Sequence, residues 1–279
     1  MLDRIYLEIT NVCNLSCTFC HKTKRRGAFI SECEFDTVLE KIKDRAKHLY
    51  FHLMGEPCLH PLLPSFIEKA RESGFLPAIT TNGTLLSRVG DAIISAKPYK
   101  VSVSLHAPEA NVAFSDEGYL SSCIDFAKKA AENGIFVALR LWNLGTESDN
   151  SQIIERLRGA FQGEWEERRG GKSVRVASRI FIEFAERFAW PDAALPESEE
   201  DSDAFCYALR EQVGILVDGS VVPCCLDSEG AMTLGNIFNE SFEDIINCKR
   251  AKAICDGFSR RRAVESLCRK CGYRSRFSK

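Results

Sequence analysis

Two kinds of segment alternate along the first 190 residues, and this alternation restricts the fold more than any other feature of the sequence. Six short runs, most of them bounded by the β-branched and aromatic residues typical of buried strands, lie at 4–10, 48–54, 76–81, 100–106, 135–141 and 179–184. The segments between them place apolar residues at helical spacing, first from Phe35 to Ile42 behind Ser31 and Glu34. Repeated units of about 30 residues predict an α/β fold with a parallel sheet and crossover helices. Functional side chains in such folds follow the carboxyl ends of the strands.

The composition changes after the sixth predicted strand. The segment 195–203 holds five acidic side chains and no basic one, which is typical of an exposed linker. Beyond it, Asp218 and Gly219 separate two apolar runs and predict a β-hairpin. We therefore expect a large domain over 1–194, an acidic linker over 195–203 and a small α+β domain over 204–279.

Charge and length exclude several classes of protein. The chain has 279 residues and a formal net charge of −2, so the whole chain is not a general binder of nucleic acids or membrane surfaces. No apolar run approaches the roughly 18 residues that span a bilayer, and the first residues lack the apolar core of a signal peptide. A cytoplasmic location is therefore expected. Thirteen cysteines are unusual there, because cytosolic disulfides are disfavoured, and they indicate metal or redox chemistry.

Three of the cysteines follow the first predicted strand at the spacing C-x3-C-x2-C, as Cys13, Cys17 and Cys20. Soft thiolate ligands select iron–sulfur clusters or zinc, and three thiolates leave one iron of a four-iron cluster open to another ligand. An open position on a metal is typical of a catalytic site. A c-type haem at the C-x-x-C-H ending in His21 and a zinc site that uses His21 are the alternatives. Neither alternative explains Cys13.

In its triplet after the first strand, the chain resembles the radical SAM superfamily. The resemblance implies a partial (βα)6 barrel and a [4Fe–4S] cluster on Cys13, Cys17 and Cys20. It also implies that S-adenosylmethionine chelates the fourth iron through its amino and carboxylate groups. Phe19 matches the aromatic position before the last cysteine, which shields the cluster in that family; ordinary packing is the alternative.

The second predicted strand ends in Met54-Gly55-Glu56-Pro57, which resembles the GGE-type motif of that family with Met54 in place of the first glycine. Gly55 permits close approach of the backbone, and Glu56 offers a carboxylate to an ammonium group. We expect both to contact the cofactor, with a turn acid as the plain alternative for Glu56. The third strand ends in Thr80-Thr81-Asn82-Gly83, which also recurs in the family.

Later strand ends carry further candidates. Ser104 matches the position at which related enzymes use a serine for the cosubstrate. An inward-pointing Arg140 needs an anion, and the carboxylate of S-adenosylmethionine is one candidate. Glu183 and Arg187 on the sixth strand either meet the substrate, with Arg187 as a catalytic candidate, or form a structural ion pair. A polar cavity is expected from the inward side chains His52, His106, Asn143 and Arg187.

A second group of cysteines lies near the C-terminus. Its four members are Cys206, Cys224, Cys268 and Cys271. The spacing C-x12-G-x4-C, through Gly219, resembles the opening of the SPASM domain, and the single C-x2-C after it resembles the shortened twitch version. The resemblance implies one auxiliary [4Fe–4S] cluster on these four thiolates. A zinc ribbon is the alternative, and Cys225 is a possible substitute for Cys224.

The resemblance implies that one electron cleaves S-adenosylmethionine to methionine and a 5′-deoxyadenosyl radical, which takes a hydrogen atom from the substrate. The auxiliary cluster then accepts an electron, so that the net reaction is an oxidation. A small polar alcohol is slightly favoured as substrate, and modification of a peptide is the alternative. A zinc-stapled binding module without turnover is a third reading, from another class.

The C-terminal segment is strongly basic. Residues 249–279 hold eleven basic and two acidic side chains. A solvated face is the plain interpretation. The functional one is docking of an acidic electron donor such as flavodoxin or ferredoxin, while RNA binding is disfavoured because few aromatic residues lie among the bases.

Overall fold

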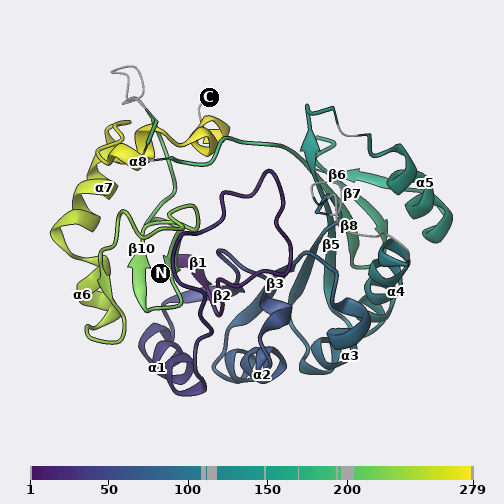
Figure 1. Ribbon diagram of the computed structural model, residues 1–279, viewed down its shortest axis with the longest axis horizontal. Helices are drawn as coiled ribbons and strands as arrows, with labels where there is room; N and C mark the ends of the chain where they lie inside the picture. Colours follow the sequence, from purple (N-terminus) through teal and green to yellow (C-terminus); the bar gives the residue numbers. More distant parts are fainter. Residues whose placement is uncertain are drawn as a thin grey trace.

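In the computed structural model, six parallel strands curve into an open barrel with helices on its outer face (Figure 1). The structure describes residues 2–107, 111, 118–147, 149–168, 170–192, 194–195 and 204–277. The strands, in spatial order, are β1 (Leu2–Leu7), β2 (Ala46–Phe51), β3 (Leu76–Thr81), β4 (Lys100–Ser104), β5 (Phe136–Leu144) and β8 (Ile180–Glu186). The outer helices are α1 (Glu32–Ile42), α2 (Leu63–Glu72), α3 (Leu86–Ala96), α4 (Tyr119–Glu132) and α5 (Ser151–Ala160). The predicted α/β barrel is thus confirmed, although the sequence pattern did not single out α3.

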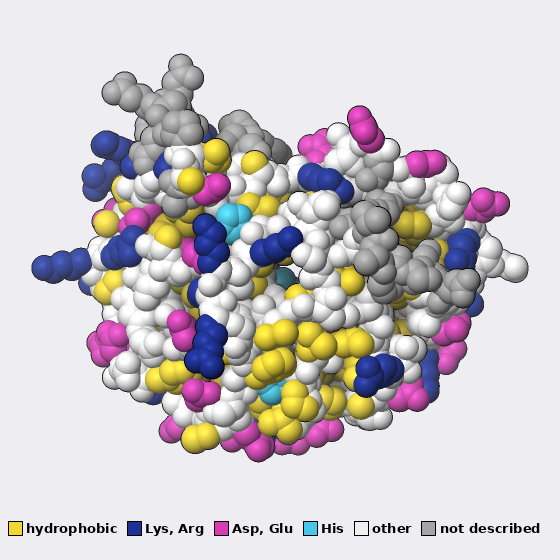
Figure 2. Space-filling model, in the orientation of Figure 1, with side chains coloured by type: hydrophobic (Ala, Val, Ile, Leu, Met, Phe, Trp, Pro, Cys, Tyr) yellow, Lys and Arg dark blue, Asp and Glu magenta, His cyan; other side chains and the backbone are white. Residues whose placement is uncertain are grey.

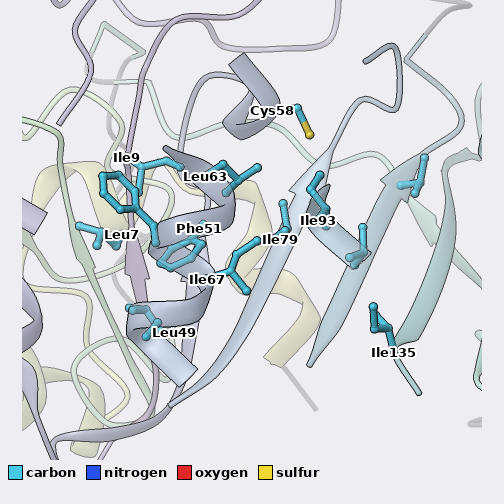
Figure 3. Close-up of a cluster of buried hydrophobic side chains, with 14 of the residues drawn as sticks. Leu7, Ile9, Leu49, Phe51, Cys58, Leu63, Ile67, Ile79, Ile93 and Ile135 are labelled. Atoms are coloured by element: carbon cyan, nitrogen blue, oxygen red, sulfur yellow. The ribbon is translucent and has the colours of Figure 1, made fainter. Parts of the chain in front are cut away.

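The first helix shows how the sequence builds this layer. Ser31 and Glu34 form a capping box, in which each side chain accepts a hydrogen bond from the backbone N–H of the other residue. The helix then buries Phe35, whose ring stacks on that of Phe66 in α2 with centroids 3.9 Å apart. Figure 3 shows part of the core that results, where Phe51 of β2 and Ile79 of β3 lie beside Leu63 and Ile67 of α2. Burial of this apolar face attaches each helix to the sheet.

At one edge the sheet continues in a way the sequence did not predict. Strands β6 (Glu166–Arg168) and β7 (Ser173–Ala177) add to β8 in antiparallel order. Gly170 and Gly171 both have positive φ at the turn between them. All three residues of β6 are exposed and charged, so the segment lacks the apolar alternation by which a strand is recognised.

At the other edge the C-terminal segment joins the same sheet. Strand β9 (Gln212–Ile215) pairs parallel with β1, and β10 (Ser220–Val222) returns beside β9. This is the hairpin predicted around Gly219, whose φ is +83°. It is followed by β11 (Gly235–Asn236), α6 (Phe242–Ile246), α7 (Lys249–Ser259) and α8 (Ser266–Arg269).

The C-terminal segment also has a small core of its own. Ala204 and Ala208 pack there against Ile254 and Phe258 of α7. The predicted acidic linker, 195–203, lies outside the described residues except for its first residue. Among the described residues, no helix is both long and apolar enough to cross a membrane.

Candidate active site

The loop after β1 carries the first cysteine triplet, and residues beyond β3 and β4 hold this loop in place. Asn82 donates from Nδ2 to Asn14 Oδ1 at 2.9 Å, and Asn14 Nδ2 donates to Thr84 Oγ1 at 2.8 Å. Beyond β4, Asn111 Nδ2 lies 3.0 Å from Cys17 Sγ, within range of a weak hydrogen bond to sulfur. Figure 1 shows the loop crossing the centre of the open barrel. The triplet is thus positioned by side chains at the carboxyl edge of the sheet.

Gly55, just beyond β2, lies against the start of the cysteine loop. Its φ is +76°, and a Cβ atom there would lie 2.4 Å from the carbonyl oxygen of Thr10. Next to it, the backbone N–H of Glu56 donates to Val12 O at 2.8 Å. The close approach predicted at Gly55 is therefore made to the chain's own backbone. It allows the end of β2 to support the residues that lead into Cys13.

Glu56 is buried, with 2% of its surface exposed. Its carboxylate accepts hydrogen bonds from Thr81 Oγ1 at 2.7 Å, from the Cys58 N–H at 3.0 Å and from the Asn82 N–H at 2.6 Å. Burial raises the pKa of this carboxyl, and these hydrogen bonds act in the opposite direction. The carboxylate thus ties the end of β2 to the end of β3, a function that the sequence did not suggest. Contact with an ammonium group of the cofactor stays a prediction.

Phe19 points from the cysteine loop toward the barrel wall. Its ring centroid lies 5.1 Å from that of His106, and the guanidinium carbon of Arg187 lies 5.0 Å from the same ring. The backbone carbonyl of Phe19 accepts a hydrogen bond from Trp190 Nε1 at 3.1 Å. Phe19 therefore packs between the loop and the segment that follows β8, and shielding of a cluster stays a prediction.

A cavity of about 350 Å³ occupies the centre of the barrel. Figure 2 shows the molecule hollowed at this point, with a histidine side chain deep in the hollow. Four of the predicted site residues line the cavity, namely Phe19, Ser104, Arg140 and Arg187. The C-terminal segment closes the other side with Tyr207, Gln212, Cys225, Leu226, Tyr273 and Phe277. The cavity is thus formed jointly by the barrel and the C-terminal segment.

Two polar residues expected inside the barrel have partners of their own. Asn143 is buried and donates from Nδ2 to Asn150 Oδ1 at 2.9 Å, so its predicted place in the polar cavity is not supported. Glu183 Oε1 lies 2.7 Å from Lys100 Nζ. Glu183 is therefore in a structural ion pair, with Lys100 rather than with Arg187.

Three buried side-chain nitrogens in the described part of the chain lack a hydrogen-bond partner, and all three belong to residues that line the cavity. They are Arg4 Nε, His52 Nδ1 and Arg140 Nε. A buried polar group without a partner costs roughly 1–3 kcal/mol, so such groups point to a missing ligand or to water. Their common location indicates a polar ligand in the central cavity.

The histidines of the cavity are neutral at physiological pH. Burial, with a smaller effect of the Arg140 charge, lowers the pKa of His52 to about 3. Burial likewise lowers the pKa of His106 to about 4. Burial also lowers the pKa of Arg140 to about 10, at which the guanidinium remains charged at neutral pH. The positive charge in this part of the cavity therefore comes from arginine and not from histidine.

The second group of cysteines lines a cavity of its own. Cys206, Cys224, Cys268 and Cys271 are all on the wall of a small cavity of about 30 Å³. Burial raises the pKa of all four thiols, so a cation is needed to stabilise their thiolate forms. This cavity shares three wall residues with the central one, namely Gln212, Leu226 and Tyr273. The two cavities are therefore immediate neighbours.

Cys225 faces the central cavity and is not on the wall shared by the four cysteines. Burial raises the pKa of its thiol to about 12, while a hydrogen bond with Tyr6 lowers it slightly. Cys224 is therefore the one of the two that shares a wall with Cys206, Cys268 and Cys271, and its place as a cluster ligand stays a prediction.

Comparison with protein families identifies both parts of the chain. Residues 7–157 match the model of the radical SAM superfamily, and residues 206–272 match SPASM, described as an iron–sulfur cluster-binding domain. The chain belongs to the radical SAM superfamily. Its barrel and its C-terminal segment are therefore the radical SAM and SPASM parts that the two cysteine motifs predicted.

Individual relatives and solved structures are similar to most of the chain, at low sequence identity. A subtilosin biosynthesis protein, AlbA of Bacillus subtilis, is 24% identical over 263 residues, which are 86% of this chain and 58% of AlbA. The structure of BtrN in complex with AdoMet and 2-DOIA has a TM-score of 0.60 at 17% identity and covers 97% of this chain and 93% of BtrN. A structure of anSMEcpe with bound AdoMet and a peptide has a TM-score of 0.64 at 15% identity and covers 100% of this chain and 91% of anSMEcpe. The chain spans 24% to 58% of the length of the curated relatives it matches.

The residues present fit the cofactors of radical SAM proteins, which are [4Fe–4S] clusters and S-adenosylmethionine. Three cysteines share the loop at the mouth of the barrel, and four share the wall of the second cavity. In the part of the chain that the structure describes, no three His, Cys, Asp or Glu side chains are grouped as ligands of one metal ion. The match of residues 206–272 to an iron–sulfur cluster-binding domain favours a cluster over the zinc ribbon that the sequence left open.

Several residues of this radical SAM site were not predicted from the sequence. Asn111 beside Cys17, and Tyr6, Tyr207 and Tyr273 in the cavity wall, follow no motif. Arg4 and Tyr6 alternate on β1 and both line the central cavity, and this alternation is the signal that could have identified Tyr6. Tyr207 and Tyr273 reach the cavity wall only because the C-terminal segment folds over the barrel. No local sequence pattern predicts that arrangement.

Proposed function

We propose that this chain is a radical SAM oxidoreductase that oxidises a small polar substrate in the central cavity. When bound, the cofactors supply reductive cleavage of S-adenosylmethionine, hydrogen-atom abstraction by the 5′-deoxyadenosyl radical and, at the auxiliary cluster, acceptance of one electron. The observation that carries the proposal is the contiguity of the two cavities through Gln212, Leu226 and Tyr273. A substrate in the central cavity would lie beside the four-cysteine site.

The chain's own residues would position the reactants and exclude water. Ser104 and Arg187 both line the cavity, Arg187 over the ring of Phe19, and they are the candidates for contacts with S-adenosylmethionine. The aromatic side chains Trp142, Trp190, Phe188 and Tyr273 also line it. Such a wall limits access of water to a reactive intermediate.

The size of the cavity supports a small substrate. A volume of about 350 Å³ lies near the lower end of the range for small-molecule sites, roughly 300–1,000 Å³, and S-adenosylmethionine would share it, so a small substrate fits better than a bulky one. The similarity to the fold of BtrN, whose structure holds AdoMet and 2-DOIA, agrees with this. Peptide modification is the second candidate, supported by the similarity to AlbA and to the peptide-bound structure of anSMEcpe.

Reduction requires an external one-electron donor. Arg260, Arg261 and Arg262 are exposed after α7, and Figure 2 shows Lys and Arg side chains at this edge of the molecule. Their charge supports docking of an acidic protein such as flavodoxin or ferredoxin.

The experiment combines reconstitution with a product assay. Anaerobically reconstituted protein should hold about eight irons and, with a reductant and S-adenosylmethionine, should form 5′-deoxyadenosine. The Cys13→Ala/Cys17→Ala/Cys20→Ala variant should form none, whereas Cys268→Ala should still form it. Formation of 5′-deoxyadenosine by the triple variant, or binding of zinc in place of iron, would contradict the proposal.

A further inference from the structure

We infer that the substrate of this enzyme carries an anionic group, a carboxylate or a phosphate, and that Arg140 binds it with His52 alongside. The inference rests on the proposed function, because it takes the central cavity as the substrate chamber. It also departs from the sequence-based prediction, in which Arg140 binds the carboxylate of S-adenosylmethionine.

The geometry of Arg140 is that of an unused anion site. Its guanidinium lies flat on the indole of Trp142, with 3.3 Å between the guanidinium carbon and the ring centroid. Stacking occupies one face of the guanidinium and leaves its N–H edges free to point into the cavity. The Nε atom is buried and has no hydrogen-bond partner. A planar guanidinium with an unpartnered N–H donor matches the geometry of a carboxylate or a phosphate.

The acidic residue beside Arg140 in the sheet also serves a second cation. Glu183 is the register partner of Arg140 in the neighbouring strand β8. Its carboxylate, however, is paired with Lys100 at 2.7 Å. On the other side, Arg4 pairs with Asp3 and Glu211 at 2.9 and 3.6 Å. One carboxylate, that of Glu183, is thus shared between two cations, Lys100 and Arg140, and cannot neutralise both.

The surroundings of Arg140 include the wall that the C-terminal segment provides. Burial lowers the pKa of Arg140, whereas Glu183, Tyr6, Tyr273 and Cys225 raise it, and the charge of Arg140 in turn lowers the pKa of His52. These residues belong to β8, to β1, to the turn beyond β2 and to the C-terminal segment. The guanidinium carbon of Arg187 lies 5.0 Å from the ring of Phe19 on the triplet loop, so a carboxylate at the triplet has a second arginine available to it.

His52 completes the site as a neutral partner. Its Nδ1 is buried without a partner, and its ring packs edge-on against Tyr6 with centroids 5.2 Å apart. A neutral imidazole can donate one hydrogen bond to an anion without adding charge. The pair would therefore bind one anionic group and leave the rest of the substrate toward the shared wall of the two cavities.

The test measures binding of inorganic phosphate and of acetate to the reconstituted enzyme by isothermal titration calorimetry at low ionic strength, with and without saturating S-adenosylmethionine. We expect at least one of the two anions to bind in both conditions. Arg140→Met should weaken that binding at least tenfold and should change the Kd for S-adenosylmethionine less than threefold. The anion that binds more tightly indicates whether the substrate is a carboxylate or a phosphate.

Two further variants make the result decisive. Arg158 also stacks on a tryptophan, Trp165, at 3.9 Å but lies on the exposed surface, so Arg158→Met should bind anions as the wild type does. If Arg140→Met fails to retain about eight irons, Arg140→Lys is measured instead. Lysine keeps the positive charge but lacks the paired N–H donors of the guanidinium, so this variant should weaken anion binding severalfold.

Competition between the anion and S-adenosylmethionine would overturn the inference, as would equal weakening of cofactor binding by Arg140→Met, because Arg140 would then serve the cofactor. Absence of anion binding to the wild type would also overturn it. Formation of 5′-deoxyadenosine by the wild-type protein tests the proposed function separately.

Discussion

Cys224 and Cys225 are adjacent in the sequence but face different cavities. Cys224→Ala should therefore lower the iron content of the reconstituted protein from about eight to about four, because one auxiliary ligand is lost. Cys225→Ala should leave about eight irons, since its thiol faces the central cavity. Colorimetric iron analysis and the absorbance near 400 nm provide the measurement, with Cys33→Ala, an exposed thiol, as control. Equal iron loss in Cys224→Ala and Cys225→Ala would refute this division.

Glu56 provides a second test at the level of a single residue. Glu56→Ala removes the acceptor of three buried hydrogen bonds and should lower the free energy of unfolding by about 3 kcal/mol. Glu72→Ala, at the exposed end of α2, should change it by less than about 0.5 kcal/mol. Urea unfolding followed by circular dichroism measures both. A Glu56→Ala protein as stable as the control would show that the carboxylate does not tie β2 to β3.

Residue types and spacing were sufficient to predict many of the residues that line the central cavity and the four cysteines that share the wall of the second, because clustered thiols and inward-pointing arginines have few other uses. They were not sufficient for contacts that depend on relative placement. The carboxylate of Glu56 is an example, because its partners Thr81 and Asn82 belong to a different strand. Asn143 is another, since Asn150 satisfies it.

At the level of elements, alanine substitutions at two glycines test the contact between the end of β2 and the cysteine loop. Gly55 and Gly74 both have positive φ, +76° and +89°, so alanine at either position costs about 1 kcal/mol of backbone strain. Only at Gly55 would the new Cβ atom meet other atoms, at 2.4 Å from Thr10 O. Gly55→Ala should therefore displace the loop and reduce the iron content to about four, whereas Gly74→Ala should keep about eight.

Iron analysis and electron paramagnetic resonance of the reduced proteins distinguish these outcomes. Retention of both clusters in Gly55→Ala, with an unchanged melting temperature, would mean that β2 does not support the loop.

The elements themselves were predicted where periodicity is strong. The six parallel strands and α1 combine apolar spacing with clear caps or breaks. Strand β6 was missed because its residues are all charged and exposed, and it exists through pairing with β7. The parallel pairing of β9 with β1 joins residues more than 200 positions apart and has no local signal.

At the level of the whole molecule, the C-terminal segment closes the cavity of the barrel. Gly272 N–H donates to Ala189 O at 3.1 Å, and Arg276 Nη2 donates to Glu186 O at 2.6 Å. These bonds hold Tyr273 and Phe277 in the cavity wall. The Tyr273→Ala/Phe277→Ala variant should keep about eight irons but admit water, so that formation of 5′-deoxyadenosine without substrate should rise severalfold.

Chromatographic assay of 5′-deoxyadenosine over time measures this change. Lys252→Ala, on the exposed side of α7, serves as control. Unchanged turnover in the double variant would show that the C-terminal segment does not seal the cavity.

The central claim is that the cluster on Cys13, Cys17 and Cys20 has one iron without a protein ligand, to which S-adenosylmethionine binds. Pulsed electron–nuclear double resonance of the reduced Cys268→Ala protein, with S-adenosylmethionine labelled with ¹⁵N in the amino group and ¹⁷O in the carboxylate, measures this most directly. The account predicts hyperfine coupling of both labels to the remaining cluster. Absence of both couplings, with a cluster spectrum that does not change when S-adenosylmethionine is added, would contradict it.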